Sequence, residues 1–203
     1  MAGRIPKVTA ETWVDTARRS LTEEGIGAVK VDRLASRLGV TRGGFYHYFK
    51  DREDLLAQLL SSWERTCRFL PDDPPGTKPA EAALWLDRMV DRLIETDGYD
   101  HHFDLAVREW GRSDQRAAWA VERADRERLK SLQRAFELLG YDPDKARIRA
   151  RVFYYHQIGY YAIGVRQSIQ ERRRNKASYL EILFGPEILI DRRARRPARV
   201  QAR

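Results

Sequence analysis

Three side chains in the segment "RGGFYHYFK" have the types and the spacing to bind nucleic acid: Arg42, Tyr46 and Lys50. On a helix, residues four positions apart lie on the same face. An arginine can donate two hydrogen bonds to O6 and N7 of guanine, whereas a lysine ammonium and a tyrosine hydroxyl suit phosphate oxygens. Phe45 and Phe49 have the same spacing on another face, where we expect them to pack in the core. The segment therefore predicts a helix with one buried face and one face that suits DNA.

The elements that must position these side chains are two short helices joined by a tight turn. Apolar residues at i, i+3, i+4 and i+7 predict a helix over Val31–Leu38, and Gly39 follows as a left-handed C-terminal residue. We expect Thr41 to cap the next helix, over about residues 42–48. This arrangement is typical of the helix-turn-helix motif, whose second helix lies in the major groove of DNA.

Two adjacent glycines near the start of that second helix need a reason, since each costs a helix roughly 0.8–1.0 kcal/mol relative to alanine. Gly43 and Gly44 lack a Cβ atom, so the helix backbone can come close to another surface at this point. The candidate surfaces are DNA and the preceding helix. We predict that contact with one of them offsets the cost.

Helical periodicity dominates the whole chain, and no stretch shows the convincing alternation of a strand. The sequence predicts an all-α fold of about nine helices. We expect these to cover residues 9–24, 31–38, 42–48, a segment capped by Asp51, and residues 80–96, 100–111, 114–139, 144–171 and 177–184. A proline-rich break at residues 71–79 separates the N-terminal part from the rest. The basic residues 191–203 are expected to be a disordered tail.

The chain is basic, but its charge is not concentrated in the segment that suits DNA. It has 38 Lys and Arg against 30 Asp and Glu, a surplus of +8 over 203 residues. Residues 1–55 hold ten against eight, a net +2, whereas residues 166–176 hold five against one and residues 187–203 six against two, a net +4 each. DNA binding must therefore be argued from positioned residues, because total charge is weak evidence.

Composition and motifs exclude several other classes of protein. Cys67 is the only cysteine, so a disulfide within the chain is impossible, which fits a reducing compartment. Neither a signal peptide nor an apolar run of the ~20 residues needed for a membrane span is apparent, so we expect a soluble cytoplasmic protein. No fingerprint of a hydrolase, a metalloprotease or a nucleotide-binding enzyme occurs, so we expect no enzyme activity and no cofactor. His101, His102, Asp104 and His156 match no strong metal signature, and a solvated helix start is the better interpretation.

The segment "VDRLASRLGVTRGGFYHYFKDREDLL", residues 31–56, resembles the DNA-binding domain of TetR-family transcriptional repressors. The resemblance extends over residues 8–67. It implies an all-helical homodimer in which each subunit has a helix-turn-helix DNA-binding domain at residues 8–67. A fourth helix links this domain to a larger ligand-binding and dimerisation domain at residues 79–190. It also implies a ligand-responsive regulator, by family habit a repressor, that binds a palindromic operator as a dimer and is released by a small effector.

The resemblance assigns DNA contacts residue by residue. Thr41 and Tyr46 would contact phosphate, and Arg42 and Gly43 would lie nearest the base edges. The complete set of expected DNA-binding residues is Lys30, Thr41, Arg42, Gly43, Gly44, Tyr46, His47 and Lys50.

Several positions of this segment allow a second interpretation. Lys30 stands where the family usually has Thr or Ser, so a helix cap is lost, although the lysine could still reach a phosphate. Asp32 stands where some members have a basic residue, and phosphate would repel its carboxylate. It could instead stabilise the N-terminus of its own helix. His47 could be a solvated surface histidine, and Tyr48 could serve packing alone.

The most informative segment of the larger domain is residues 150–167, which are apolar on more than one helix face. Such a helix is buried on more than one side, and we expect one face to meet a partner subunit. The expected dimer-interface residues are Val152, Tyr155, Gly159, Ala162, Arg166, Leu180 and Leu183. The candidate ligand-pocket residues are Trp85, Met89, Phe103, Trp110, His156 and Tyr160. For the pocket set, an ordinary hydrophobic core is the competing interpretation.

Two other functions stay open at this point. A DNA-binding regulator without an effector would have no cavity in its core. A helical enzyme with an incidental N-terminal domain would need catalytic groups that the sequence does not show.

Overall fold

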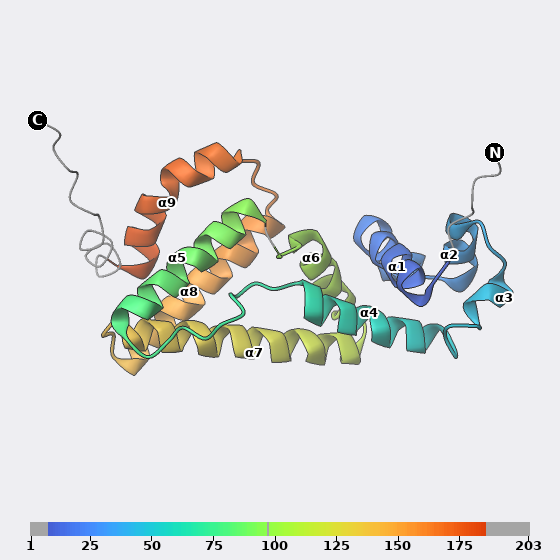
Figure 1. Ribbon diagram of the computed structural model, residues 1–203, viewed down its shortest axis with the longest axis horizontal. Helices are drawn as coiled ribbons and strands as arrows, with labels where there is room; N and C mark the ends of the chain where they lie inside the picture. The colour runs from blue at the N-terminus through green and yellow to red at the C-terminus, as the bar shows by residue number, and fades with distance from the viewer. Residues whose placement is uncertain (1–7, 97, 186–203) are drawn as a thin grey trace, which may run out of the picture. The chain divides into compact units, whose positions relative to one another are not determined.

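A computed structural model of the chain describes residues 8–96 and 98–185, and within them every regular element is a helix (Figure 1). In chain order these are α1 Ala10–Glu24, a 3₁₀ turn Ile26–Ala28, α2 Val31–Leu38, α3 Arg42–Phe45, α4 Arg52–Thr66, α5 Pro79–Glu95, α6 His101–Trp110, α7 Gln115–Leu138, α8 Pro143–Ala162 and α9 Ile169–Phe184. The predicted all-α fold of about nine helices is confirmed for this part of the chain. The predicted tail at residues 191–203 lies outside it.

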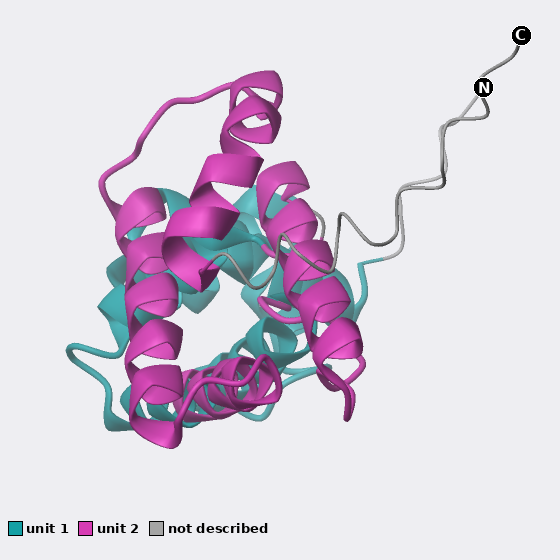
Figure 2. Cartoon of the chain, turned by 90° about the vertical axis from the view of Figure 1, so that its left-hand side faces the viewer, with its two compact units in different colours: residues 1–67, 100–124 teal, residues 68–99, 125–203 magenta. Residues whose placement is uncertain are grey.

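The chain divides into two compact units (Figure 2). Unit 1 comprises residues 1–67 and 100–124, and unit 2 comprises residues 68–99 and 125–203. Residues 100–124 group with unit 1 because Phe103, Val107 and Trp110 of α6 belong to the same buried cluster as the N-terminal helices. The expected assignment of DNA binding to residues 8–67 and of ligand binding and dimerisation to residues 79–190 stays a prediction.

Local caps fix the helix ends of unit 1 much as the sequence predicts. The Thr9 side chain accepts a hydrogen bond from the Thr12 amide at 3.2 Å, and the Asp51 side chain accepts one from the Asp54 amide at 2.9 Å. Gly39 ends α2 at φ 67°, ψ 29°, a left-handed conformation that favours glycine. Helix α3 departs from the prediction. It ends at Phe45, the Thr41 side chain makes no capping bond, and a turn carries the chain to residue 49.

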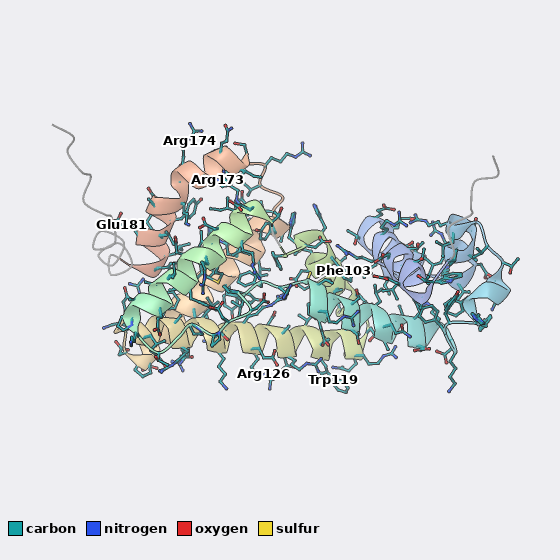
Figure 3. All side chains as sticks on the ribbon, viewed as in Figure 1. Phe103, Trp119, Arg126, Arg173, Arg174 and Glu181 are labelled. Atoms are coloured by element: carbon teal, nitrogen blue, oxygen red, sulfur yellow. The ribbon has the colours of Figure 1, made fainter. Side chains whose placement is uncertain are left out.

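The core of unit 1 holds α3 by its inner face. The side chains of Phe45 and Phe49 are buried, and their rings stack at a centroid distance of 5.1 Å. The Trp13 ring meets Phe45 edge-on at 5.3 Å. Phe103 of α6 lies in the same buried cluster, whereas Trp119 is 60% exposed on α7 (Figure 3). Truncating a buried phenylalanine to alanine typically costs about 3–5 kcal/mol, so this packing fixes which side chains of α3 face outward.

Unit 2 contains α5, α8, α9 and the C-terminal part of α7, and its interior is rich in aromatic residues. The Tyr154 hydroxyl donates to Asp125 at 2.6 Å and accepts from Arg128 at 3.1 Å. The Tyr161 hydroxyl donates to the Leu93 carbonyl at 2.9 Å. These polar ends explain how large tyrosines remain buried between helices, since each hydroxyl has a partner.

The predicted single helix over residues 144–171 is wrong. Helix α8 ends at Ala162, and Gly164 takes a left-handed conformation at φ 72°. Helix α9 then begins at Ile169, earlier than the predicted residue 177, because the Ser168 side chain accepts a hydrogen bond from the Glu171 amide at 3.1 Å. The break was not predicted because the apolar pattern of α8 was taken to continue through residue 171. Gly164 and Ser168 are the local signals that could have located it.

Candidate DNA-binding surface and ligand pocket

Seven of the eight side chains or backbone positions expected to contact DNA are exposed in unit 1. Gly44 is half-buried, and the exposed set comprises Lys30, Thr41, Arg42, Gly43, Tyr46, His47 and Lys50. Because Phe45 and Phe49 are buried between them, the row of Arg42, Tyr46 and Lys50 faces solvent. We call these three residues the α3 row.

Two neighbours hold Arg42 in place. Its Nη2 donates to the Tyr46 hydroxyl at 3.1 Å, and its Nη1 lies 3.6 Å from Asp32 Oδ1. The hydrogen bond to Tyr46, then the charge of Asp32, raises the pKa of Arg42 above its ordinary value. Arg42 is nevertheless 60% exposed, so its remaining N–H groups are available to a partner.

The pair between Asp32 and Arg42 is a feature that sequence reasoning missed. Asp32 lies in the first turn of α2 and Arg42 in the first residue of α3, so the turn at Gly39 brings two helix starts together. Phosphate approaching Arg42 must compete with this carboxylate. The opposite charges of the two residues were the available signal, but their separation of ten positions fits no helical spacing.

The absence of a side chain at Gly43 and Gly44 is not required by packing within unit 1. A Cβ atom built on Gly43 would meet only Thr41 Oγ1, at an ordinary 3.7 Å, and one built on Gly44 would meet nothing within 4 Å. The preceding helix is thus excluded as the surface that these glycines approach. The expected approach of these glycines to DNA, the other surface considered from the sequence, stays a prediction.

The neighbouring polar residues have mixed roles. Tyr48 is a packing residue, because its hydroxyl donates to the Val8 carbonyl at 2.6 Å. His47 is exposed and meets the Tyr48 ring edge-on at 4.9 Å. Lys30 makes no side-chain capping bond, as expected for a lysine at that position, and its exposed side chain stays free to approach a phosphate. Arg52, which the sequence did not single out, ties the start of α4 to the loop before α2 by donating to the Val29 carbonyl at 2.7 Å.

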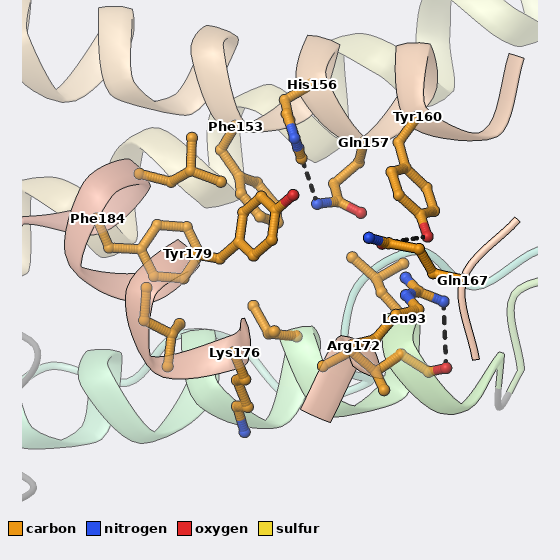
Figure 4. A pocket seen from close by; sticks show the side chains of 14 residues that line it. Leu93, Phe153, His156, Gln157, Tyr160, Gln167, Arg172, Lys176, Tyr179 and Phe184 are labelled. Carbon is orange, nitrogen blue, oxygen red and sulfur yellow. Dashed lines mark hydrogen bonds between the residues drawn. The ribbon is translucent and has the colours of Figure 1, made fainter. Parts of the chain in front are cut away.

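Unit 2 contains a small pocket between α5, α8 and α9, with a cavity volume of about 50 Å³ (Figure 4). Of the six candidate pocket residues, His156 and Tyr160 line it. Trp85 and Met89 are buried in unit 2 but do not line it. Phe103 and Trp110 lie in the core cluster of unit 1. The interpretation as ordinary core replaces the pocket role for these four, since aromatic and methionine side chains fill cores as readily as they line cavities.

The pocket combines an apolar wall with a few polar groups that sequence reasoning did not assign to it. Among them are Gln157, Gln167, Arg172 and Lys176. The partial burial of His156 lowers the pKa of its imidazole, which favours the neutral ring at pH 7. The burial of Tyr161 behind the pocket raises the pKa of its hydroxyl, and the nearby Arg172 opposes that shift.

The residues expected at a dimer interface fall into two groups. Val152 and Tyr155 are exposed on α8, Tyr155 by 58%, together with Ala162 and the following Arg166, while Gly159 is half-buried. Leu180 is buried, Leu183 is half-buried, and both line the pocket. The last two therefore face the interior of unit 2, because α9 turns its Leu180 side toward α8 and α5. The large exposed apolar residues of α9 are Ile169, Tyr179 and Ile182, of which Ile182 is 76% exposed.

The candidate metal residues do not assemble into a site. Within residues 8–96 and 98–185, no group of three or more His, Cys, Asp or Glu is placed to hold a metal ion. The rings of His101 and His102 lie 4.0 Å apart at the start of α6, and His156 belongs to the other unit. None of the helices in the described part of the chain has the length and apolarity to cross a bilayer.

Comparison with known proteins agrees with this geometry. Residues 14–59, which run from α1 to the middle of α4, match the family described as "Bacterial regulatory proteins, tetR family". By this match, residues 14–59 are a tetR-type N-terminal domain. The resemblance drawn from residues 31–56 is thereby confirmed.

Curated relatives of the tetR-type domain share only this region. The transposon Tn10 TetC protein of Escherichia coli is 39% identical over 51 residues, 25% of this chain and 26% of that protein. The HTH-type transcriptional regulator AcrR of Shigella flexneri is 34% identical over 56 residues, 28% of this chain and 25% of that protein. The chain thus matches about a quarter of the length of these relatives.

Solved structures extend the likeness of the fold. A transcriptional regulator from Rhodococcus sp. Rha1 has a TM-score of 0.56 at 17% identity, over 92% of this chain and 97% of that one. At this identity the likeness concerns the fold alone.

Proposed function

We propose that this tetR-family chain is a sequence-specific transcriptional regulator that binds a palindromic operator as a homodimer and releases it on binding a small effector. The observation that carries the proposal is the α3 row, which is exposed and backed by two buried phenylalanines. The row offers one arginine fork, one phenol and one ammonium on the exposed side of α3 and of the turn that follows it. These are the groups that contact guanine edges and phosphates.

The rigidity of α3 supports this proposal. The Phe45 and Phe49 rings are fixed in the core, and Tyr46 is fixed to Arg42 by a hydrogen bond. A base-reading arginine gains specificity when its side chain is held before DNA arrives, because less conformational freedom is lost on binding. With no side chain at Gly43, the backbone of α3 can approach the groove as closely as the row requires.

The exposed apolar stripe of α8 supports the homodimer. Ile148, Val152 and Tyr155 recur at helical spacing on α8 and are exposed, as is Ile163 directly after the helix, and Ile182 adds to the apolar surface from α9. A second copy of the chain is the partner we propose for this stripe, because a two-fold axis lets the same surface cover itself. Two DNA-binding domains in such a dimer would meet half-sites about 34–36 Å apart, one turn of DNA.

The pocket of unit 2 supports effector control. It lies at the junction of α8 and α9 with α5, and a ligand there would act on the same helices that carry the exposed apolar surface. To shift an operator-binding state from 99:1 to 1:99, the effector must favour the released state by about 5.5 kcal/mol. The proposed sign of regulation is repression in the absence of effector.

A regulator without an effector is the second candidate, and the size of the pocket favours it. A cavity of about 50 Å³ is well below the roughly 300–1,000 Å³ of typical small-molecule sites. Effector control therefore requires either a small ligand or a pocket that opens. Operator binding that stays unchanged in every ligand titration would establish the second candidate.

The proposal is tested with full-length protein and an operator duplex obtained by selection from random DNA. Arg42→Ala should weaken operator binding by roughly ten- to hundredfold and relax the preference at one operator position. Lys50→Ala should weaken binding to all sequences and reduce the salt slope of log K by about one unit. Arg65→Ala is the matched control, since Arg65 is exposed on α4 and has no ion pair among the described residues. Equal losses for Arg42→Ala and Arg65→Ala would contradict the proposal.

A further inference from the structure

We propose that the unit 2 pocket takes a small organic carboxylate, an apolar body with a single negative charge, and that Arg172 binds the charged group. The proposal rests on the proposed function in taking this pocket as the effector site. It adds the chemical class of the ligand and the residue that recognises it.

Arg172 is a cation without a counter-ion among the described residues. Its Nη1 donates to the Ile94 carbonyl at 3.2 Å, and its Nη2 donates to the Tyr161 hydroxyl at 3.3 Å. The guanidinium lies over the Tyr160 ring at 5.0 Å. These contacts hold the group in place, yet each partner is neutral, so the positive charge is not balanced within the described part of the chain. A partly buried arginine of this kind gains most from a carboxylate, to which it can donate two parallel hydrogen bonds.

Lys176, the other cation in the pocket wall, has its positive charge balanced by carboxylates. It lies one turn further along α9 and also lines the cavity. Its ammonium lies 2.7 Å from Asp87 and pairs as well with Asp91, both on α5. Two carboxylates thus satisfy Lys176, and an anionic ligand would gain little from it. Of the two cations in the pocket wall, Arg172 is the one left to recognise a negative charge.

The polar groups beside Arg172 are arranged in a chain that leads away from it. The Tyr160 hydroxyl donates to Gln167 Oε1 at 3.0 Å, and Gln167 Nε2 donates to Glu171 at 3.1 Å. This hydrogen bond occupies one carboxylate oxygen of Glu171, which does not line the cavity and makes no ion pair with Arg172. A ligand carboxylate at Arg172 would therefore lie beside neutral amide and phenol groups, which can donate hydrogen bonds after small rotations.

The end of the pocket away from Arg172 determines the chemistry of the uncharged part of the ligand. Figure 4 shows Arg172, Gln167 and Tyr160 gathered at one end, with Phe153 and Phe184 at the other. Leu180 and Leu183 of α9 also line the cavity, and Leu93 of α5 lies beside Arg172 (Figure 4). An aromatic ring or a short alkyl chain would lie there with its charged end on Arg172.

The cavity volume limits the size of this ligand. An apolar cavity of about 150 Å³ holds benzene, so a volume of about 50 Å³ requires the pocket to widen even for a one-ring acid. Tyr179 lines the pocket yet is partly exposed, and its ring lies 5.5 Å from that of His156. Rotation of this side chain toward solvent would enlarge the cavity without moving the helices.

The test uses full-length protein without DNA and two pairs of probes with matched shapes: benzoate with benzamide, and hexanoate with hexanamide. Calorimetric titration should show that each carboxylate binds about tenfold or more tightly than its amide, the gain expected from one charged hydrogen-bond pair. In Arg172→Met this preference should disappear. Arg174→Met is the matched control, because Arg174 is exposed on the same helix and does not line the cavity (Figure 3).

Arg172→Met removes the hydrogen bond to the Ile94 carbonyl, and the variant could misfold for this reason. A measurement on the unaltered protein therefore tests the role of Arg172 independently of the variant. In ¹⁵N spectra the Nε–H signal of Arg172 should shift with benzoate and stay in place with benzamide. Equal affinity for acid and amide overturns the proposal. So does a preference that survives in Arg172→Met, or a lack of binding by both acids up to about 10 mM, a concentration at which millimolar binding would be detected.

The operator assay separates this proposal from the proposed function. If benzoate binds through Arg172 but leaves operator affinity unchanged, the ligand class stands and effector control fails. If the protein binds its operator normally and neither acid binds, the carboxylate proposal fails while DNA-binding regulation stands.

Discussion

Replacing Gly43 by alanine should change stability and operator affinity in opposite directions. The backbone of α3 at this residue is not in the left-handed region, so alanine fits the helix without strain. Its Cβ would meet only Thr41 Oγ1, at 3.7 Å. Alanine also loses less conformational entropy on folding than glycine. We therefore expect the free energy of unfolding to rise, because nothing in unit 1 resists the added methyl group.

The size of the gain follows from the length and position of the helix. A Gly→Ala change in a compatible helix site is worth about 0.4–1 kcal/mol, and α3 has only four residues, so we expect about 0.5 kcal/mol. For a chain of 203 residues this corresponds to a rise of about 1–2 °C in Tm. The same methyl group would hold the α3 backbone away from DNA, and operator affinity should fall about tenfold, equivalent to losing one charged hydrogen bond.

The assay compares thermal unfolding by circular dichroism with operator binding by fluorescence anisotropy. Gly27→Ala is the control, since a Cβ there meets nothing within 4 Å and Gly27 lies outside α3. It should leave operator affinity unchanged. If Gly43→Ala binds the operator as tightly as the unaltered protein, no external surface approaches α3 closely, and the reasoning about the two glycines is refuted.

Three further changes test other parts of the account. Asp32→Asn removes a carboxylate that competes with phosphate for Arg42. The affinity for any DNA should therefore rise roughly three- to tenfold at low salt, and this gain should fade at high salt. An unchanged salt dependence of DNA binding would contradict this expectation. Tyr155→Asp places a charge in the exposed stripe of α8 and should shift a sedimentation profile from dimer to monomer, whereas an unaltered profile would place the interface elsewhere. Burial lowers the pKa of His156, so the unfolded state binds a proton more readily than the folded state. The free energy of unfolding should therefore fall as the pH drops below 6.5, the ordinary pKa of histidine. His156→Gln should flatten this part of the pH profile of stability, and a profile identical to that of the unaltered protein would contradict the lowered pKa.

Local chemistry explains why the N-terminal helices could be predicted closely. Thr9, Gly39 and Asp51 end or begin their helices through bonds within a few residues, so their roles can be read from the sequence. The spacing of Phe45 and Phe49 likewise identified the buried side of α3 and of the turn after it. These signals need no knowledge of which distant segments come together.

The pocket could not be predicted in the same way, because its members come from three helices. Arg172 lines the cavity only because α9 begins at Ile169, and the sequence had placed this residue in the basic run before the last helix. Trp85 and Phe103 have the same apolar character as true lining residues, and only the fold shows that they fill a core. Residue type alone does not distinguish the two environments.

The base preference selected by the protein tests the central claim most directly. Full-length protein should enrich palindromic duplexes from a random library, with half-site centres about 10–10.5 base pairs apart or a multiple of that spacing. The same selection with Arg42→Ala should lose the preference at one symmetric pair of positions and keep the others, because the α3 row reads bases through that arginine. A selected site without symmetry, or one that Arg42→Ala leaves unchanged, would contradict the account.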